Sequence, residues 1–475
     1  MAQLPLGSDA RPLRVAVIGS GPSAFYAVQA LFKTENLHVR VDVFDRLPTP
    51  FGLVRGGVAP DHQKIKSVVK LYEGVAADRR FRFFGNVMLG RDIFVDDLRA
   101  HYDQIVYAVG NESDRKLGVP GEELAGVHSA TEFVGWYNGH PDFTDRRFEL
   151  ARATRVAVVG NGNVAMDVTR ILLKDPDALA ATDIADYALE TLRTSAVREV
   201  ALLGRRGPAQ AAFSPKELEE IAELPGVDTV ITPDEGEIDA LSAEWLPTQP
   251  RSAQRNVKLI GELAAKGEGS NGKKMNCRFL VSPVEIVGRD GRVTGIKVEH
   301  AQLVADKDGT PRPKGTGRFS TLPCDIVLKA VGYRGVPVKG VPFDERGGVI
   351  PNAAGRVLDK AGGGVVAGQY VVGWAKRGPT GLIGTNSPDS VDTVRRMVAD
   401  LKAKSAAALA GNDLDAIPAL LRKRGATPIS YADWQRLDAW ELAQGEAKGK
   451  VRQKLHDVAA MLRVIAGERG AEASA

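Results

Sequence analysis

The same pattern of hydrophobic and polar positions occurs twice along the chain: a short apolar run, a glycine-rich turn, and a stretch that can form a helix. The first copy is the apolar run 15–18 followed by Gly-Ser-Gly-Pro-Ser-Ala at 19–24. The second is the apolar run 156–159 followed by Gly-Asn-Gly-Asn-Val-Ala at 160–165. Short apolar runs bounded by glycine predict buried parallel strands. A strand, a Gly-x-Gly-x-x-Ala turn and a helix form a dinucleotide-binding unit, so the pattern predicts two Rossmann-like domains.

The first repeat continues to about residue 110. Its predicted elements are strands at 14–18, 39–44 and 104–109 and helices from about Ser23 and near 65–75. Residues 47–62 contain three prolines and three glycines, which makes this segment too rich in helix-breaking residues for a helix. Ligands bind at the carboxyl ends of parallel strands, so we expect this loop to form a wall of a cofactor site.

The second repeat contains a predicted helical excursion and three further strands. These elements are expected at 176–194, 281–287, 293–299 and 326–330. Residues 328–335 echo residues 105–110, because both are apolar strands that end on glycine. We interpret the two segments as the points where the chain leaves the first domain and returns to it.

The predicted fold is therefore of the α/β class, with two doubly wound, three-layer dinucleotide-binding domains and the second inserted into the first. The predicted boundaries are 1–110 and 331–400 for the first domain, 111–330 for the second, and 401–475 for a C-terminal helical extension. The extension has an amphipathic stretch near 451–465 and a tail, 467–475, that we expect to be disordered. It carries no recognisable chemistry.

The residues that follow the second strand of each repeat have opposite charge. Asp45 ends the first repeat's second strand, and Arg205 and Arg206 end the corresponding strand of the second repeat. A carboxylate hydrogen-bonds the free hydroxyls of an adenosine ribose, whereas guanidinium groups bind a 2′-phosphate. Two nicotinamide nucleotides in one chain would have no redox partner. The charges therefore indicate FAD in the first site and NADPH in the second.

The composition of the chain narrows the class of protein further. The chain has 475 residues, of which 44% are hydrophobic and 26% charged, enough for two globular domains. It contains no long uninterrupted apolar segment and no apolar signal core near the start, so we expect a cytoplasmic protein without membrane insertion. Its two cysteines, Cys277 and Cys324, lie far apart, which excludes an iron–sulfur cluster or a redox dithiol built from this chain, and no metal site is expected.

Charge is distributed unevenly along the second domain. A net charge of +4 is too small to indicate nucleic-acid binding. Residues 216–239 are strongly acidic and residues 251–278 are strongly basic, so the basic segment could steer an acidic protein partner to one face. A solvated basic surface without a partner is an equal alternative. The candidate docking residues are Arg251, Arg255, Lys258, Lys273 and Lys274.

A set of motifs in a fixed order resembles one protein family. The motifs are Gly-Ser-Gly-Pro-Ser-Ala at 19–24, Pro-Phe-Gly-Leu-Val-Arg at 50–55, Val-Ala-Pro-Asp-His at 58–62, Phe-Phe-Gly-Asn-Val at 83–87, Gly-Asn-Gly-Asn-Val-Ala at 160–165, Gly-Arg-Arg-Gly-Pro at 204–208, Gly-Tyr-Arg-Gly at 332–335 and Gly-Trp-Ala-Lys-Arg-Gly-Pro-Thr-Gly at 373–381. Together they closely resemble the adrenodoxin-reductase-like NADPH–ferredoxin reductases, especially the actinobacterial members. The resemblance implies a glutathione-reductase-like architecture.

The resemblance also implies an activity. NADPH would give a hydride to FAD, which would pass electrons singly to a ferredoxin that feeds acceptors such as cytochromes P450. The implied FAD contacts are Gly19, Gly21, Ser23, Asp45, Leu53, Leu89, Trp374, Gly381, Leu382 and Ile383. The implied NADPH contacts are Arg115, Asn161, Gly162, Asn163, Val164, Arg205, Arg206 and Glu217, with Gly381 touching both cofactors. The family often has glutamate at the position of Asp45, which makes the reach of this shorter carboxylate to the ribose uncertain.

Three titratable residues are the catalytic candidates. By resemblance, His62 and Glu220 lie near the flavin, with His62 supporting the ring and Glu220 as its acidic partner; a histidine in such a loop is more often only a structural hydrogen-bonding group. Glu217 would accept a hydrogen bond from the nicotinamide carboxamide, and its alternative is one more acid on a solvated helix. Trp374 would cover the flavin edge or belong to the core. The glycine-rich turn at 373–386 would point backbone N–H groups at the flavin.

Three other functions stay open on the sequence. A flavin-dependent monooxygenase shares both fingerprints but needs a closed pocket for an organic substrate, and an NADPH oxidase or diaphorase needs no protein acceptor. A nucleotide-binding redox sensor would reduce slowly and pass electrons nowhere. We expect a monomer or a weak dimer.

Overall fold

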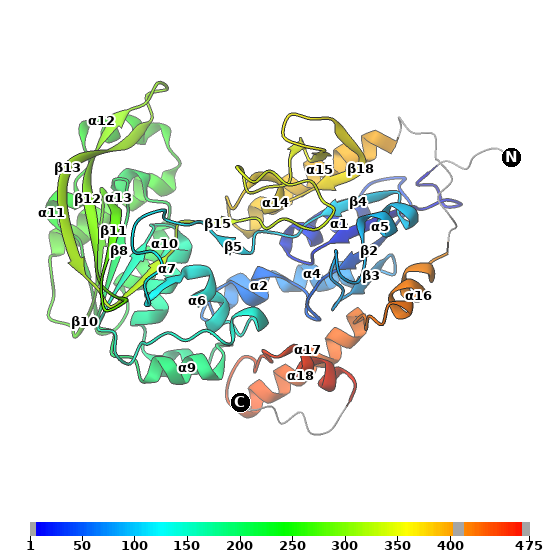
Figure 1. The fold of residues 1–475 in the computed structure, drawn as a ribbon, viewed down its shortest axis with the longest axis horizontal. Helices are drawn as coiled ribbons and strands as arrows, with labels where there is room; N and C mark the ends of the chain where they lie inside the picture. The colour runs from blue at the N-terminus through cyan, green and yellow to red at the C-terminus, as the bar shows by residue number, and fades with distance from the viewer. Residues whose placement is uncertain (1–5, 402–412, 468–475) are drawn as a thin grey trace. The chain divides into compact units, whose positions relative to one another are not determined.

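The structure, a computed structural model, describes residues 6–401 and 413–467 and divides into two compact units (Figure 1). Unit 1 comprises Met1–Ser113 and Tyr333–Ala475, and unit 2 comprises Asp114–Gly332. Unit 2 is thus inserted into unit 1, and the chain crosses between them a few residues after the positions predicted from the sequence.

Unit 1 is built on a seven-stranded sheet with the order β16-β17-β18-β4-β1-β2-β3. Its strands are β1 (Leu13–Ile18), β2 (Val39–Phe44), β3 (Phe81–Phe84), β4 (Gln104–Tyr107), β16 (Asn352–Ala353), β17 (Arg356–Leu358) and β18 (Val365–Val371). The five strands from β18 to β3 are parallel, and the two at the other edge are antiparallel. Every residue of β1 is buried, which explains its continuous apolar run.

The central strands of this sheet end at one edge. Ile18 at the end of β1 lies opposite Phe44 of β2 and Tyr107 of β4. The loops that follow these strands, beginning at Gly19 and Asp45, therefore meet at the carboxyl edge of the sheet, where parallel α/β sheets bind their ligands.

Helices pack on both sides of this sheet and extend beyond it. They are α1 (Pro22–Phe32), α2 (Leu53–Gly56), α3 (Gln63–Lys66), α4 (Val69–Ala76), α5 (Val95–His101), α14 (Trp374–Arg377), α15 (Asn386–Leu401), α16 (Ala416–Lys423), α17 (Tyr431–Ala447) and α18 (Val458–Ile465), with a 3₁₀ turn at Ile383–Thr385. One core cluster joins α1, α4 and the C-terminal helices through stacked and edge-on rings of Phe25, Phe51, Tyr72 and Trp434. The extension is therefore part of the core of unit 1.

Unit 2 contains a six-stranded parallel sheet with the order β6-β14-β7-β8-β10-β9. Its strands are β6 (Val127–Ser129), β7 (Arg155–Val159), β8 (Glu199–Leu203), β9 (Val227–Val230), β10 (Lys273–Arg278) and β14 (Ile326–Lys329). A separate antiparallel sheet consists of β11 (Val281–Arg289), β12 (Arg292–Ala305) and β13 (Pro311–Pro323). A further two-stranded sheet, whose residues other than Asp114 belong to unit 1, pairs β5 (Ser113–Asp114) with β15 (Tyr333–Arg334).

The helices of unit 2 complete its doubly wound arrangement. They are α6 (Ala130–Tyr137), α7 (Asn163–Leu173), α8 (Pro176–Ala180), α9 (Asp186–Arg193), α10 (Pro215–Ala222), α11 (Pro233–Gly236), α12 (Ala240–Trp245) and α13 (Arg251–Lys266), with 3₁₀ turns at Pro141–Phe143, Pro208–Gln210 and Leu246–Thr248. The predicted α/β class with two Rossmann-like sheets is confirmed, although the sheet of unit 1 also has two antiparallel strands at one edge.

The structure differs from the predicted elements at four places. The single helix expected near 65–75 is two short helices, α3 and α4. The expectation that 47–62 contains no helix is wrong for one turn, α2, which Gly52 allows by adopting a φ of 48°. The predicted excursion at 176–194 is two short helices rather than one. Residues 451–457 are not helical, because Asp457 caps the start of α18 by accepting a hydrogen bond from the Ala460 N–H at 2.7 Å.

Among residues 6–401 and 413–467, the structure contains no helix of the length and hydropathy that a membrane span requires. The predicted disordered tail falls almost wholly outside these residues.

Candidate cofactor-binding sites

In the first glycine-rich turn, Gly19 lies against the backbone of a neighbouring segment and Gly21 faces open space. Gly19 has a φ of 97°, and a Cβ there would lie 2.4 Å from the carbonyl oxygen of Ala108. At Gly21 a Cβ would meet no atom within 4 Å. Gly21 is the N-cap of α1 and provides no side-chain cap, so the first N–H groups of the helix face that open space. An uncapped helix N-terminus beside an open glycine suits a pyrophosphate.

Asp45 lies beside this turn and holds it. Its carboxylate accepts hydrogen bonds from the N–H and the hydroxyl of Ser20, and from the Leu47 N–H at 2.9 Å. Burial raises the pKa of Asp45 above its ordinary value, although these hydrogen bonds and Arg46 act against the rise. Its position at the carboxyl edge is the one predicted, and the bond to Ser20 is a second role that the sequence pattern did not reveal.

The loop after β2 lies directly against the fingerprint turn. The Phe51 N–H donates to the carbonyl of Ser20 at 3.0 Å, and a Cβ at Gly52 would lie 3.0 Å from the Cα of Gly21. Leu53 begins α2 two residues beyond Phe51. The predicted wall of the site is thus in contact with the turn that would bind pyrophosphate.

Two further predicted residues of unit 1 are buried near the same loops. Leu89 belongs to the core cluster that also contains Ile18 and Phe44. His62 is buried at the N-terminus of α3, where its carbonyl accepts from the N–H groups of Ile65 and Lys66 at 3.0 and 3.1 Å.

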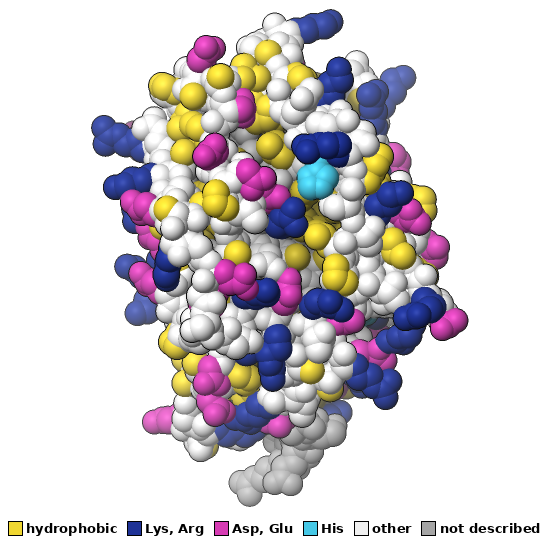
Figure 2. All heavy atoms as spheres, turned by 90° about the vertical axis from the view of Figure 1, so that its left-hand side faces the viewer, with side chains coloured by type: hydrophobic (Ala, Val, Ile, Leu, Met, Phe, Trp, Pro, Cys, Tyr) yellow, Lys and Arg dark blue, Asp and Glu magenta, His cyan; other side chains and the backbone are white. Residues whose placement is uncertain are grey.

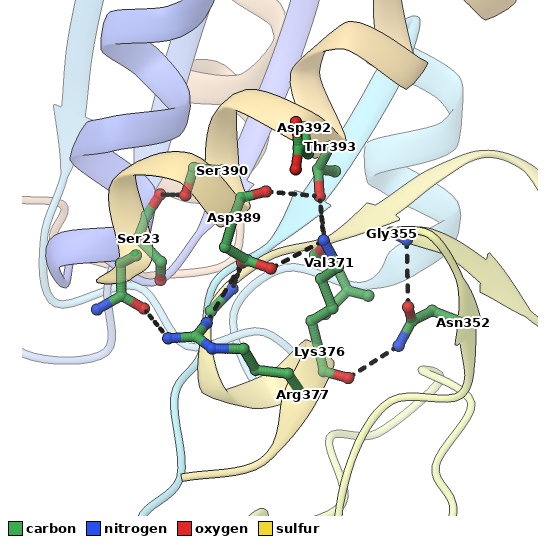
Figure 3. Close-up of polar contacts among 12 residues, drawn as sticks. Ser23, Asn352, Gly355, Val371, Lys376, Arg377, Asp389, Ser390, Asp392 and Thr393 are labelled. Carbon is green, nitrogen blue, oxygen red and sulfur yellow. Dashed lines mark hydrogen bonds and ion pairs between the residues drawn. The ribbon is translucent and has the colours of Figure 1, made fainter. Parts of the chain in front are cut away.

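The glycine-rich turn after β18 is held in place by Asp389 of α15. Figure 3 shows Lys376 and Arg377 both reaching this carboxylate. The Lys376 Nζ lies 2.8 Å from Asp389, the nearest Arg377 nitrogen lies at 3.3 Å, and the Gly373 N–H donates to it at 2.7 Å. Gly373 has a φ of 70°, and a Cβ there would lie 2.5 Å from the Ser23 hydroxyl oxygen. The turn therefore abuts the first turn of α1, and Asp389 is an anchor that we did not predict.

The remaining residues of this turn include an exposed leucine and a tryptophan with a buried ring nitrogen. Leu382 has 63% of its surface exposed, next to the 3₁₀ turn that Ile383 begins. Gly381 has a φ of 81°. The indole Nε1 of Trp374 is buried without a hydrogen-bond partner among the described residues, and its ring lies 5.2 Å from that of Tyr333.

Asn111, just beyond β4, also has buried polar atoms without a hydrogen-bond partner among the described residues. It is 3% exposed, and neither atom of its side-chain amide has a partner among the described residues. Buried polar atoms are almost always hydrogen-bonded, so an unpaired amide at this edge of the sheet fits a polar ligand. Nothing in the local sequence around Asn111 distinguished it from an ordinary turn residue.

The second fingerprint turn, in unit 2, repeats the geometry of the first. Gly160 has a φ of 133°, and a Cβ there would lie 2.3 Å from the carbonyl oxygen of Ala330. At Gly162, the uncapped N-cap of α7, a Cβ would meet nothing within 4 Å. The Nδ2 of Asn161 is buried without a partner among the described residues. Asn163 instead accepts from the Ser214 N–H at 2.8 Å, and Val164 packs against the core.

Arg205 and Arg206 follow β8 as predicted, and neither forms an ion pair within the described part of the chain. Burial and the guanidiniums of Arg205 and Arg312 lower the pKa of Arg206. Arg312 lies on β13, opposite Val304 of β12. Arg312 is itself paired with Asp306 at 2.9 Å, so Arg205 and Arg206 are the guanidiniums without a carboxylate partner among the described residues. Two such groups side by side form a positive site that suits a phosphate.

The acidic candidates of unit 2 face a buried arginine. Glu217 and Glu220 lie on α10, and Arg170 of α7 reaches them at 3.0 and 3.6 Å. Arg170 is almost completely buried and also pairs with Asp167 at 2.7 Å. Glu217 is therefore not a solvated acid, since Arg170 fixes its carboxylate. Arg115 is exposed, and its N–H donates to the carbonyl of Gly332 at 3.1 Å.

The predicted docking residues lie on α13 and β10, and most of them have partners. Arg255 pairs with Glu219 at 2.5 Å, Lys258 with Glu262 at 3.8 Å and Lys274 with Glu268 at 3.1 Å. Lys273 donates to the carbonyl of Leu173 at 2.9 Å. Figure 2 shows cationic and acidic side chains interspersed over the face that it draws.

Both cysteines are free and buried in unit 2. Burial raises the pKa of the Cys324 thiol to about 12 and that of Cys277 further. Neither thiol is activated as a nucleophile or redox group.

Two sheets of mainly parallel strands, each with a Gly-x-Gly-x-x-Ala turn at an uncapped helix N-terminus, define a two-domain dinucleotide-binding protein of the α/β class. No family model matches the chain. It is 46% identical over 465 residues to the NADPH-ferredoxin reductase FprA of Mycobacterium tuberculosis, over 96% of this chain and 100% of that protein. It is 42% identical over 464 residues to the human mitochondrial NADPH:adrenodoxin oxidoreductase, over 95% of this chain and 92% of that protein.

A solved structure agrees with these relatives. Mycobacterium tuberculosis FprA in complex with NADPH superposes with a TM-score of 0.89 at 45% identity, over 96% of this chain and 100% of that one. The chain belongs to the family of FprA and the adrenodoxin oxidoreductases. The resemblance stated from the motifs is confirmed.

Proposed function

We propose that this protein is an FAD-dependent NADPH–ferredoxin oxidoreductase, with FAD bound by unit 1 and NADPH by unit 2. The observation that carries the proposal is the opposite charge after the second strand of the two dinucleotide units, Asp45 in one and Arg205 with Arg206 in the other. Membership of the FprA family supports it. When bound, the flavin accepts a hydride from NADPH and releases the electrons singly to an iron–sulfur acceptor.

In unit 1 the chain would bind FAD through the start of α1, through Asp45 and through residues of the neighbouring loops. The N–H groups at the start of α1, with the open face of Gly21, would bind the pyrophosphate. Asp45 would accept from the ribose with oxygen lone pairs that its bonds to Ser20 and Leu47 leave available. The other proposed contacts are Gly19, Ser23, Leu53, Leu89, Trp374, Gly381, Leu382 and Ile383.

The unpaired atoms of unit 1 fit this assignment. The Trp374 Nε1 can donate to a ligand acceptor, and the Asn111 amide can both donate and accept. Asp389 would keep the turn from Gly373 onward against α1, so that its N–H groups stay oriented. Each of these groups acts by holding or orienting, and none needs to be a nucleophile.

In unit 2 the start of α7 and Gly162 would bind the pyrophosphate of NADPH, and Arg205 and Arg206 its 2′-phosphate. Arg170 holds the carboxylate of Glu217, which would accept a hydrogen bond from the carboxamide. The other proposed contacts are Arg115, Asn161, Asn163 and Val164. His62 belongs to unit 1 and Glu220 to unit 2, and their pairing near the flavin stays a prediction.

The partner would be a ferredoxin with an acidic face that docks near α13 and β10. Arg251 is exposed, and the Lys258 side chain is 78% exposed with its acid 3.8 Å away, so these two offer the most available charge. The ion pairs of Arg255 and Lys274 reduce the field of the surface. We therefore expect Lys258→Glu to slow ferredoxin reduction at low salt, with little effect at high salt. A rate independent of ionic strength would remove this surface from the proposal.

The decisive experiment combines a spectrum with an acceptor assay. The purified protein should be yellow, should bleach with NADPH faster than with NADH, and should reduce cytochrome c only when a ferredoxin is added. A colourless protein that takes up no added FAD would overturn the proposal. NADPH consumption coupled to hydroxylation of an organic compound would replace it with a monooxygenase. The cytoplasmic location and the oligomeric state predicted from the sequence stay predictions.

A further inference from the structure

A fully buried carboxylate lies in the C-terminal extension, where the sequence showed no recognisable chemistry. Glu441 on α17 is 0% exposed. Arg55, 386 residues earlier in the chain, binds it as a two-pronged fork, with nitrogen–oxygen distances of 2.6 and 2.8 Å. A bidentate guanidinium–carboxylate pair fixes both the distance and the orientation of the two groups.

The surroundings of Glu441 keep it ionised. Burial alone would raise its pKa, but Arg55 and Arg452 outweigh that effect and hold the pKa of Glu441 below its ordinary value. Arg452 donates to the carboxylate at 2.9 Å, and the Leu455 N–H donates to it at 2.8 Å. Arg452 also pairs with Asp438 at 2.6 Å. A buried charge is stable only when it is paired and hydrogen-bonded in this way.

Arg55 connects Glu441 to the loop that forms the wall of the proposed cofactor site. It lies in α2, in the loop whose Phe51 N–H donates to Ser20 and whose Gly52 approaches Gly21. The Arg55 guanidinium also lies 5.2 Å from the centre of the Trp434 ring. The loop is thus held between the fingerprint turn on one side and the C-terminal extension on the other.

A second contact reinforces the same loop. The Lys454 ammonium donates to the carbonyl of Arg55 at 3.3 Å, and the Trp434 ring meets the edge of Phe51 at 5.9 Å. The segment that supplies Lys454 lies close to α17, since a Cβ at Gly445 would be 2.6 Å from the Cα of Arg452. Side chain, backbone and ring contacts from the extension therefore converge on residues 51–55.

We propose that Glu441 is a positioning residue for FAD: through Arg55, the C-terminal extension clamps the loop 51–56 against the turn that binds the pyrophosphate. The inference rests on the proposed function, because it requires FAD in unit 1. A clamped loop presents its N–H groups and side chains to the cofactor without first being ordered, which slows release of the cofactor. Glu441 itself touches no cofactor atom in this account.

The chain offers a control for Arg55 with the same kinds of contact in a more exposed ion pair. The Arg55 and Glu441 side chains are 13% and 0% exposed, and those of Arg424 and Asp97 are 31% and 18% exposed. Arg424, at the end of α16, also forks a carboxylate, that of Asp97, at 2.6 and 2.9 Å. Its guanidinium also lies 5.2 Å from an aromatic ring, that of Phe94. It too joins the extension to unit 1, but through α5 rather than through the loop 51–56. Arg55→Lys and Arg424→Lys therefore remove the same fork and keep the same charge.

The test compares FAD release from the holoenzymes of the wild type, Arg55→Lys, Arg424→Lys and Glu441→Gln. Release is followed by the rise in flavin fluorescence after dilution, and hydrogen exchange of residues 51–56 is measured in the apoproteins. We expect FAD to leave Arg55→Lys about tenfold faster than Arg424→Lys, the effect of losing one charge-assisted hydrogen bond. Exchange at 51–56 should rise in Arg55→Lys and Glu441→Gln but not in Arg424→Lys, and the KM for NADPH should not change.

The outcomes separate the two proposals. If the wild type holds FAD and Arg55→Lys releases it no faster than Arg424→Lys, the clamp is wrong while the proposed function stands. If the wild type takes up no FAD, the proposed function fails first. Glu441→Gln should release FAD at least as fast as Arg55→Lys; should it fail to fold, Arg55→Lys alone decides, because it retains the positive charge opposite Glu441.

Discussion

Replacing Arg206 with alanine tests the assignment of the second site most directly. Arg206 is half-buried after β8 and has no carboxylate partner among the described residues, whereas its neighbours Arg205 and Arg312 lower its pKa. An anionic ligand would relieve this repulsion and accept the guanidinium's hydrogen bonds. The 2′-phosphate is the only part of NADPH that NADH lacks, so the loss should be confined to NADPH.

The burial of the two arginines sets the size of the effect. A hydrogen bond to a charged group contributes about 1.5–3 kcal/mol, so Arg206→Ala should lower kcat/KM for NADPH by roughly 12- to 150-fold. Arg205 is exposed, and solvent screening reduces its contribution to about 0.2–1 kcal/mol, a change of roughly 1.5- to 5-fold. The value for NADH should stay within about twofold of the wild type.

The assay is steady-state reduction of ferricyanide, with NADPH and NADH measured side by side at two salt concentrations. Arg289→Ala is the control, since it removes an exposed arginine from the β11–β12 turn of the same unit. The NADPH preference should also fall as salt rises, because screening weakens contacts with phosphate. Equal losses with both nucleotides, or the same loss in the control, would refute the phosphate role.

Three other predictions concern the two turns, the anchor at α15 and the clamp. Gly160→Ala should lower the Tm of the apoprotein, because its Cβ would lie 2.3 Å from a carbonyl oxygen. Gly162→Ala should leave the Tm unchanged and raise the KM for NADPH, because its Cβ would enter the open space that the pyrophosphate would occupy. A thermal melt in which Gly162→Ala loses more stability than Gly160→Ala would contradict both assignments. Asp389→Asn should weaken FAD binding about tenfold by loosening the turn from Gly373, measured by titrating FAD into the apoprotein, and an unchanged affinity would exclude the anchor. The pKa of Glu441 lies below its ordinary 4.5, so its ionised form stabilises the protein above about pH 4.5, and that stability is lost as the pH falls further. The free energy of unfolding in urea should therefore fall less steeply with decreasing pH in Glu441→Gln than in the wild type. The same pH dependence in both proteins would contradict this prediction.

Much of the fold was predictable because its signals are local. The buried strands β1 and β7 appear as apolar runs, and the turns after them need glycine for steric reasons that do not depend on distant residues. The positions of Asp45 and Arg206 followed from the same logic, since each comes directly after a strand that ends at the carboxyl edge. The family resemblance depended on these short motifs, and the relatives confirmed it.

The missed residues have no such local signal. Asp389 lies on an ordinary polar helix, and only folding places it under the turn from Gly373. The basic segment illustrates the opposite error: its charge count is correct, but acids such as Glu219, from a different helix, neutralise part of it. A count along the chain cannot show which charges are paired in space.

The sequence alone determined that the chain has two dinucleotide units, that one is inserted into the other, and that the residues after their second strands have opposite charge. Strand periodicity, glycine turns and the charge after a strand are all properties of neighbouring residues. Only the tertiary structure decided that Asp45 binds Ser20, which acids Arg170 pairs with, and that Glu441 reaches Arg55 across 386 residues. These contacts join segments far apart in the chain, and their partners are chosen by packing rather than by any pattern that a local stretch of sequence carries.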